Sequence, residues 1–140
     1  MRSLERLREI GRVVLDTNAV IAYRQGIPKI CRIINESDIL YLPVIVLGEL
    51  LYGAFNSSRI ASNEQALLKF TEYTDIIHID EAITRRYARI RLLLKKSGHP
   101  IPENDIWIAA SCLELDAPIV SRDSHFKFID NLRIISWESE

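Results

Sequence analysis

Acidic side chains stand in separate parts of this sequence, at places where carboxylates can do chemistry: Asp16, Glu49, Asp105 and Asp123. Asp16 directly follows the apolar residues 13–15, and Asp123 comes just after residues 119–121. Short apolar runs of this kind are typical of buried strands, and ligands of open parallel sheets bind beyond the carboxyl ends of the strands. Each Asp taken alone could equally be a helix N-cap, a position that Asp favours strongly.

Glu49 is the only charged residue between Asp38 and Arg59. On a helix, the residues one turn away from it are apolar or small: Ile45, Val46, Tyr52 and Gly53. An ionised carboxylate in such surroundings needs a cation, because an isolated buried charge is very unfavourable. We favour a bound metal for Glu49, and a structural Arg partner is the alternative.

Asp105 falls in the first turn of a helix predicted over residues 103–115, where the helix dipole stabilises an acid. Its neighbours Glu103 and Asn104 are also polar, so the position alone says little. The face that carries Asp105 continues through small and apolar residues: Ile108, Ala109 and Cys112. Asp105 therefore points inward, as either a hydrogen-bond acceptor of the core or a metal ligand.

The acids are most informative as a set. Two carboxylates about 4 Å apart repel by roughly 4 kcal/mol at an effective dielectric constant of 20. Bringing several together is reasonable only if cations bind among them, and hard oxygen ligands favour Mg²⁺ or Mn²⁺ over Zn²⁺. Such ions activate water and stabilise the oxyanions of a phosphodiester under attack. The set predicts metal-dependent phosphodiester hydrolysis.

The elements that must position these acids alternate between strands and helices. Strands are predicted at residues 13–15, 39–42, 75–79, 118–121 and 132–136, and helices at residues 19–23, 28–35, 43–55, 63–73, 81–96 and 103–115. Two helix starts are specific predictions: Pro43 as the first residue of one helix, and Ser62 or Asn63 as the N-cap of the next. Asp123 is expected to start a short helical segment. The pattern predicts an α/β fold with a mostly parallel sheet of four to five strands, covered on both faces.

Composition limits the class of protein. The 140 residues suit one domain, predicted over residues 12–138 behind an N-terminal extension at 1–11. The formal net charge of -1 gives no general attraction for a polyanion, so basic groups for nucleic acid must be clustered locally. Cys31 and Cys112 lack metal or disulfide spacing and are predicted to be buried thiols. No segment reads as a membrane span or a signal peptide, so we expect a cytoplasmic protein.

A helix predicted over residues 81–96 places basic side chains over one broad side: Arg85, Arg89, Arg91, Lys95 and Lys96. Such a face could follow a phosphate backbone, although a charged helix face is more often simply solvated. Arg24 and Arg122 are expected to lie nearer the acids.

The stretches around the acids, residues 14–18, 47–54, 104–110 and 120–126, resemble the four motifs of PIN-domain nucleases. Within that family they look most like VapC-type toxins of bacterial toxin–antitoxin pairs, and the resemblance runs from about Arg12 to Trp137. It implies a three-layer α/β/α fold and a Mg²⁺- or Mn²⁺-dependent endoribonuclease that often cuts structured RNA such as tRNA. Asp16 and Asp105 match the principal metal ligands of the family.

The resemblance implies further roles. Glu49 and Asp123 would bind metal directly or through water, and Thr17 or Ser121 could hydrogen-bond a carboxylate or the attacking water. His125 matches a common residue of the family, and either a structural or a phosphate-contacting role is open. The family also implies a homodimer and a VapB-type antitoxin whose C-terminal segment blocks the acidic cleft. Apolar positions that core and interface could share are Ile30, Ile33, Ile34, Leu50 and Leu51.

Two other functions are weighed against this one. Aspartyl phosphotransfer would make Asp16 a nucleophile, but position 18 is Asn, so the general acid of such enzymes is missing. A catalytically inactive PIN-like adaptor that binds RNA or protein would need no metal. The presence of all the family's acids argues against an adaptor.

Overall fold

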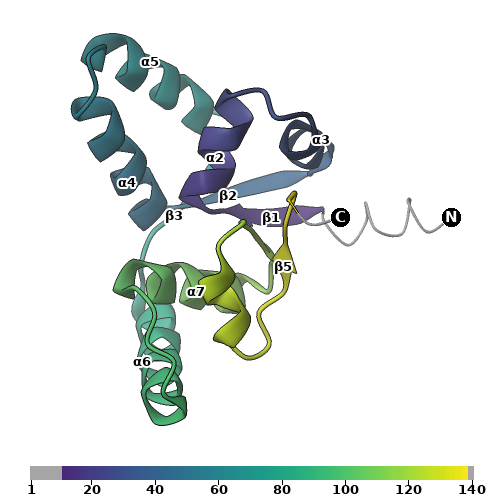
Figure 1. Ribbon diagram of the computed structural model, residues 1–140, viewed down its shortest axis with the longest axis vertical. Coiled ribbons are helices and arrows are strands. Elements are labelled where there is room, and N and C mark those ends of the chain that lie inside the picture. Colours follow the sequence, from purple (N-terminus) through teal and green to yellow (C-terminus); the bar gives the residue numbers. More distant parts are fainter. Residues whose placement is uncertain (1–10, 139–140) are drawn as a thin grey trace, which may run out of the picture.

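The computed structural model describes residues 11–138 and contains one sheet in which every strand pair is parallel (Figure 1). Its five strands lie in the order β3-β2-β1-β4-β5. Their bounds are β1 (Arg12–Leu15), β2 (Ile39–Pro43), β3 (Asp75–Ile77), β4 (Ile119–Val120) and β5 (Ile134–Ile135). The predicted α/β class and the five-strand sheet are confirmed.

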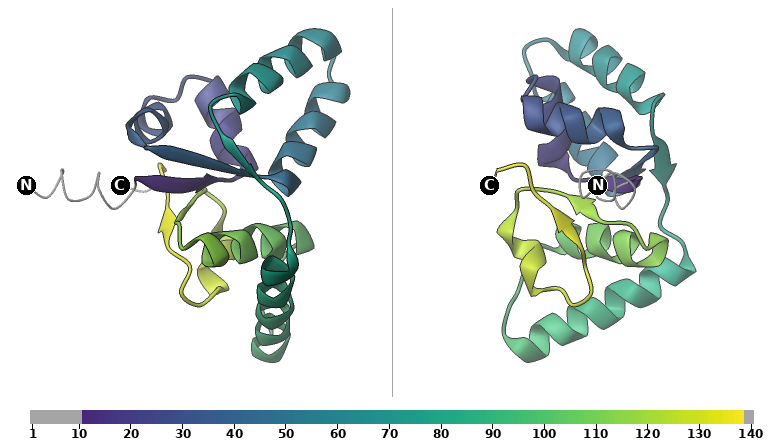
Figure 2. Two further views of the ribbon diagram at one scale, coloured as in Figure 1. Left: turned by 180° about the vertical axis from the view of Figure 1, so that it is seen from behind. Right: turned by 90° about the vertical axis from the view of Figure 1, so that its right-hand side faces the viewer.

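Helices cover both faces of this sheet, which gives a three-layer arrangement (Figures 1 and 2). One face carries α2 (Thr17–Arg24), α3 (Pro28–Glu36), α4 (Val44–Phe55) and α5 (Ile60–Thr71). The other face carries α6 (Glu81–Ser97), α7 (Glu103–Leu115) and the 3₁₀ helix η1 (Ser124–Phe128). None of the described helices is both long and apolar enough to cross a membrane.

The central strands are buried on both faces, so their residues are continuously apolar instead of alternating with polar ones. These residues have no exposed surface: Val13, Val14, Leu15, Ile119 and Val120. Cys112 is buried, as predicted, whereas Cys31 is only partly buried. Burial raises the pKa of the Cys112 thiol well above its usual range, which makes that thiol unreactive.

The order of the strands reverses between β1 and β4, which lie side by side although more than 100 residues separate them. Val14 is in register with Ile119, and Leu15 with Val120. The backbone N–H of Asp16 then donates to the carbonyl of Val120 over 3.2 Å. Doubly wound sheets bind ligands at the carboxyl ends of the strands beside such a reversal. The residues that follow β1 and β4 therefore meet at the edge where a site is expected.

Two predicted helix starts are wrong, that of α5 by a few residues and that of α4 by one. α5 begins at Ile60 after Arg59, which makes no side-chain cap, so Ser62 and Asn63 lie inside the helix. The side-chain amide of Asn63 instead donates to the hydroxyl of Ser57 over 2.8 Å. Pro43 ends β2, and α4 begins one residue later, because Pro43 keeps an extended backbone with ψ of 140°. The predicted extension lies mostly outside the described residues.

Candidate metal centre

Asp16 is the most enclosed of the acids, with 4% of its surface exposed at the end of β1. Its carboxylate caps α2 by accepting the backbone N–H of Thr17 over 2.9 Å. It also accepts the hydroxyl of Ser121 over 2.6 Å and, more weakly, the side-chain amide of Asn18 over 3.3 Å. Asp16 is thus a helix N-cap and a member of the acidic cluster at once, so these two interpretations do not compete.

Ser121, which has no exposed surface, connects the ends of the two central strands. Its hydroxyl donates to Asp16 and accepts the backbone N–H of Asp123 over 3.0 Å. The side-chain oxygen of Asn18 accepts the backbone N–H of Arg122 over 3.3 Å, which fixes the same turn from the other side. These contacts hold the Asp123 backbone at a defined place beside Asp16.

Asp105 and Asp123 meet at one imidazole ring. Nδ1 of His125 lies 3.1 Å from Oδ2 of Asp105 and 3.0 Å from Oδ1 of Asp123. Asp123 also caps η1, because its carboxylate accepts the backbone N–H of His125 over 2.9 Å. One potential ligand atom from each of these three residues lies within 4.8 Å of the others. The sequence left a structural or a phosphate-contacting role open for His125, and the contacts with both acids give it a structural one.

Glu49 reaches the cluster from α4. Its carboxylate accepts the hydroxyl of Thr17 over 3.0 Å, directly beside Asp16 in the sequence. Among residues 11–138, no Lys or Arg forms an ion pair with Glu49, so the structural Arg partner considered from the sequence is not found. Thr17 and Ser121 therefore both bind carboxylates, one holding Glu49 and the other Asp16.

The electrostatics show that the acids form one group. Burial is the main cause that raises the pKa of Asp16, and the charge of Asp123 raises it further. Burial, followed by the charges of Asp16 and Asp123, raises the pKa of Asp105 to about 6, although the His125 hydrogen bond opposes the rise. Burial and the charge of Asp16 also raise the pKa of Glu49. The pKa values of Asp16, Glu49 and Asp105 are thus all raised by burial and by acidic neighbours.

This donor set fits a hard divalent cation. Carboxylate oxygens dominate it, and the described basic side chains contribute only the ring of His125 at Asp105 and Asp123. A cation placed among the carboxylates would offset both the burial and the mutual repulsion that raise the pKa values of Asp16, Glu49 and Asp105. Asn18 orients Asp16 through its amide, and because a side-chain amide does not titrate it cannot serve as the general acid that aspartyl phosphotransfer requires.

The basic residues near the acids take different positions. Arg122 turns outward, and its guanidinium pairs with Glu138 over 3.4 Å. Arg24 is exposed in the last turn of α2. The basic side chains of α6 that were predicted on one broad side are all exposed, and Arg91 among them pairs with Glu103 of α7 over 3.0 Å.

Comparison with known proteins agrees with this fold. A sequence model of the PIN domain matches residues 13–132. The chain therefore belongs to the PIN-domain family.

Relatives identify the branch of that family. Ribonuclease VapC1 of Haemophilus influenzae (strain R2866) is 33% identical over 129 residues, which cover 89% of this chain and 96% of the relative. Ribonuclease VapC5 of Mycobacterium tuberculosis (strain ATCC 25618 / H37Rv) is 30% identical over 122 residues, covering 84% and 87%. The structure of VapBC-1 from nontypeable Haemophilus influenzae has a chain with a TM-score of 0.84 at 30% identity, covering 91% of this chain and 99% of that one. This chain is a VapC ribonuclease.

Proposed function

We propose that this chain is the toxin of a VapBC-type toxin–antitoxin pair, a metal-dependent endoribonuclease that hydrolyses RNA at the acidic cluster. The observation that carries the proposal is the convergence of four carboxylates, with raised pKa values for Asp16, Glu49 and Asp105. Such an arrangement destabilises the metal-free protein, and a cation-dependent function accounts for it. Residues 12–138 would form the PIN domain, with residues 1–11 as an extension.

Mg²⁺, or Mn²⁺, is the proposed cofactor. Asp16 and Asp105 would be its principal ligands, and Glu49 and Asp123 would bind it directly or through water. When bound, the cation supplies a hydroxide nucleophile at neutral pH and stabilises charge on the phosphodiester oxygens. The chain itself orients the ligands: Ser121 holds Asp16, Thr17 holds Glu49, and His125 holds Asp105 and Asp123. Attack by water, and not by the 2′-hydroxyl, leaves 5′-phosphate and 3′-hydroxyl ends.

The proposed protein partner is a cognate VapB-type antitoxin. The structures to which this chain is similar include VapBC2 from Rickettsia felis bound to a promoter DNA fragment, at 26% identity and a TM-score of 0.84. Apolar side chains are exposed on α4 and α5, including Tyr52 at 70% and Phe55 at 52%, which suits the docking of another protein.

A homodimer in the cytoplasm, with RNA such as tRNA as its substrate, completes the proposal. The sequence offered apolar residues for the dimer interface, but the structure buries most of them in the protomer. Those in the core are Ile30, Ile33, Ile34 and Leu50. A dimer would therefore use other side chains, such as the exposed apolar residues of α2, α4 and α5.

The decisive experiment incubates the purified chain with RNA and Mg²⁺ or Mn²⁺, beside Asp16→Asn and Asp105→Asn. Loss of a charge from this site should reduce cleavage by about 10³-fold, comparable to losing a preorganised electrostatic group. Asn preserves the N-cap at position 16, so a folding defect is not expected. Glu114→Gln, which changes an acid that pairs with Arg86 on the surface, is the matched control and should cleave normally. Equal cleavage by all variants, or no cleavage by the wild type, contradicts the proposal.

A further inference from the structure

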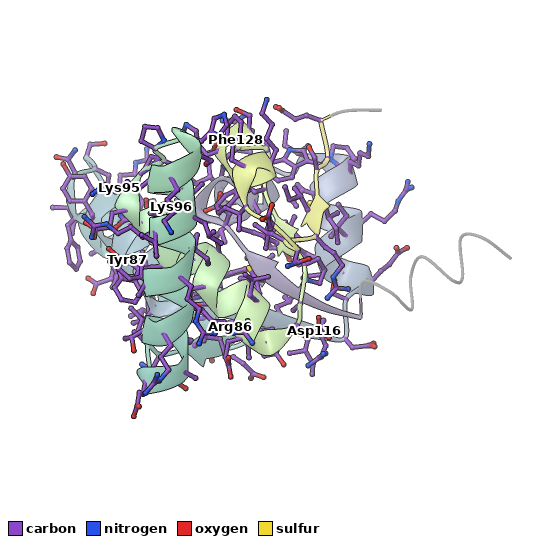
Figure 3. All side chains as sticks on the ribbon, turned by 90° about the horizontal axis from the view of Figure 1, so that it is seen from below. Arg86, Tyr87, Lys95, Lys96, Asp116 and Phe128 are labelled. Carbon is purple, nitrogen blue, oxygen red and sulfur yellow. The ribbon has the colours of Figure 1, made fainter. Side chains whose placement is uncertain are left out.

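A groove of about 530 Å³ lies on the α6 side of the sheet, between α6, α7 and the end of η1. It is separate from the acidic cluster, whose residues do not line it. Figure 3 looks at this side, with Arg86 and Phe128 on one side of α6 and Tyr87 and Lys95 on the other. The groove is on the side of Arg86 and Phe128. The groove has no part in the proposed metal centre.

The floor of the groove is apolar and its end is aromatic. Ile90, Leu94 and Leu113 form part of the floor. At the end, the ring of Phe128 stacks on the ring of His99, with centroids 4.3 Å apart and planes inclined by 13°. Phe128 remains 39% exposed, so this stacked pair presents aromatic surface to solvent.

The rim of the groove is mainly basic. Among residues 11–138, neither a hydrogen bond nor an ion pair engages the Arg89 side chain, whereas Arg86 is already paired with Glu114 over 2.7 Å. Lys127 holds its ammonium 5.2 Å from the centre of the Phe128 ring. Asp130 is the only acid in the described lining. Two cations, Arg89 and Lys127, are therefore available to an anionic occupant.

The groove is joined to the acidic cluster through η1. This helix begins directly after Asp123, its second residue His125 contacts Asp105, and its last residue Phe128 forms the end of the groove. At about 2 Å of rise per residue, the helix from first to last residue spans roughly 8 Å. Stacked nucleotides rise by about 3.4 Å each, so two or three of them cover that distance.

We propose that this groove binds the single-stranded segment of RNA that adjoins the cleavage point, an inference that rests on the proposed ribonuclease function. A base stacks on the Phe128–His99 pair, and phosphates contact Arg89 and Lys127. The flexible side chain of Lys127 can move from the ring to a phosphate. Aromatic platforms combined with cationic rims are the usual surface for single strands. An acidic peptide would use the cations but gains nothing specific from two stacked flat rings.

Binding is measured in the Asp16→Asn background, which leaves the RNA intact, using fluorescence anisotropy of a labelled 12-nucleotide single-stranded RNA over a range of KCl concentrations. Replacing both cations, Arg89→Gln with Lys127→Gln, should weaken binding about tenfold. Loss of two phosphate contacts should also reduce the slope of log Kd against log [KCl] by about 1.4. Phe128→Leu, which keeps the groove apolar, should weaken binding about tenfold or more and leave the slope unchanged.

The matched control removes the same charges from the opposite face of the sheet, as Arg32→Gln with Lys69→Gln on α3 and α5. It should leave both affinity and slope as they are. If the groove variants behave like this control, the proposal is wrong. Binding of a labelled poly-glutamate peptide that depends on Arg89 and Lys127, without any change in RNA binding, would assign the groove to an acidic protein segment instead.

Cleavage assays separate this proposal from the proposed function. If the wild type cleaves RNA, the groove variants should raise KM about tenfold with kcat unchanged, and an unchanged KM overturns the groove proposal alone. If the wild type does not cleave, yet binding still depends on Arg89, Lys127 and Phe128, the ribonuclease function is wrong and the RNA groove stands.

Discussion

Charged side chains gather in two regions of this fold and are held there in opposite ways. On the outside of α6, opposite charges pair in solvent: Arg85 and Glu81 lie 3.4 Å apart with side chains 69% and 82% exposed. At the carboxyl ends of β1 and β4, like charges converge with little solvent. The side chain of Asp105 there is only 14% exposed, and its pKa is raised to about 6.

The surface charges are thus solvated and paired with opposite charges, whereas the fold keeps the carboxylates of the acidic cluster close together despite their mutual repulsion. Exposed ion pairs contribute about 0 to 1 kcal/mol, so their presence says little about function. Clustered half-buried carboxylates destabilise the metal-free protein, and proteins keep such features where activity needs them. The following experiments test whether the two regions respond as differently as their surroundings predict.

The largest expected effect is stabilisation of the acidic region by metal. A divalent cation at about 1,000 times its Kd should raise the free energy of unfolding by about 4 kcal/mol, because it binds the folded state alone. Chemical unfolding with Mn²⁺ or with EDTA measures this difference. The variant Asp105→Asn, at the same Mn²⁺ concentration, should show much less stabilisation. An identical response of the two proteins would mean that Asp105 is not a ligand.

A smaller effect is expected from pH in the absence of metal. The folded pKa of Asp105 is about 6, above its ordinary value of 3.8, so the folded state binds the proton more tightly than the unfolded state. This carboxyl therefore lowers the free energy of unfolding progressively as pH rises from about 4 to 6, and the loss is complete above 6. The cost is on the order of 3 kcal/mol.

Asp105→Asn removes this titration, so it should be the more stable protein at pH 7.5 and lose that advantage at pH 4. Urea unfolding of both proteins in EDTA at these two pH values gives the difference directly. A stability difference that stays constant with pH would show that the Asp105 pKa is not raised.

The smallest effect is expected on the outer surface. Arg85→Gln breaks the pair with Glu81, and it should change the free energy of unfolding by less than about 0.5 kcal/mol. The change should be the same with Mn²⁺ and with EDTA, since Arg85 does not belong to the acidic cluster. A larger loss of unfolding free energy, or a loss that depends on metal, would mean that the surface ion pair and the acidic cluster do not differ as proposed.

The sequence predicted the parts of the fold that depend on local pattern. Residues 13–15 and 119–120 are strands because continuous apolar residues suit positions buried on both faces. The start of α5 could not be predicted, because Asn63 bonds to Ser57 and leaves Arg59 before the helix. A capping residue type is a preference, and a competing local partner can override it.

The candidate site likewise has features that local sequence patterns predict and features that they do not. The positions of Asp16 and Asp123 followed from the strand ends, but their closeness depends on β4 lying beside β1, a long-range choice that no local pattern contains. The contact of His125 with Asp105 joins two such segments, so it was equally out of reach. The ion pair of Arg91 with Glu103 of α7 was also out of reach, because helical periodicity does not show which acid of another helix a basic side chain meets.

Asp16 gives one carboxylate two tasks, because it starts α2 and faces the other acids. Substitutions at this position therefore differ in whether they preserve the folded structure. Asn keeps the N-cap of α2 while removing the charge, so it gives a folded but inactive protein. Ala would lose both the cap and the charge. Naturally inactive versions of this fold should accordingly carry amides, far more often than aliphatic residues, at the end of their first strand.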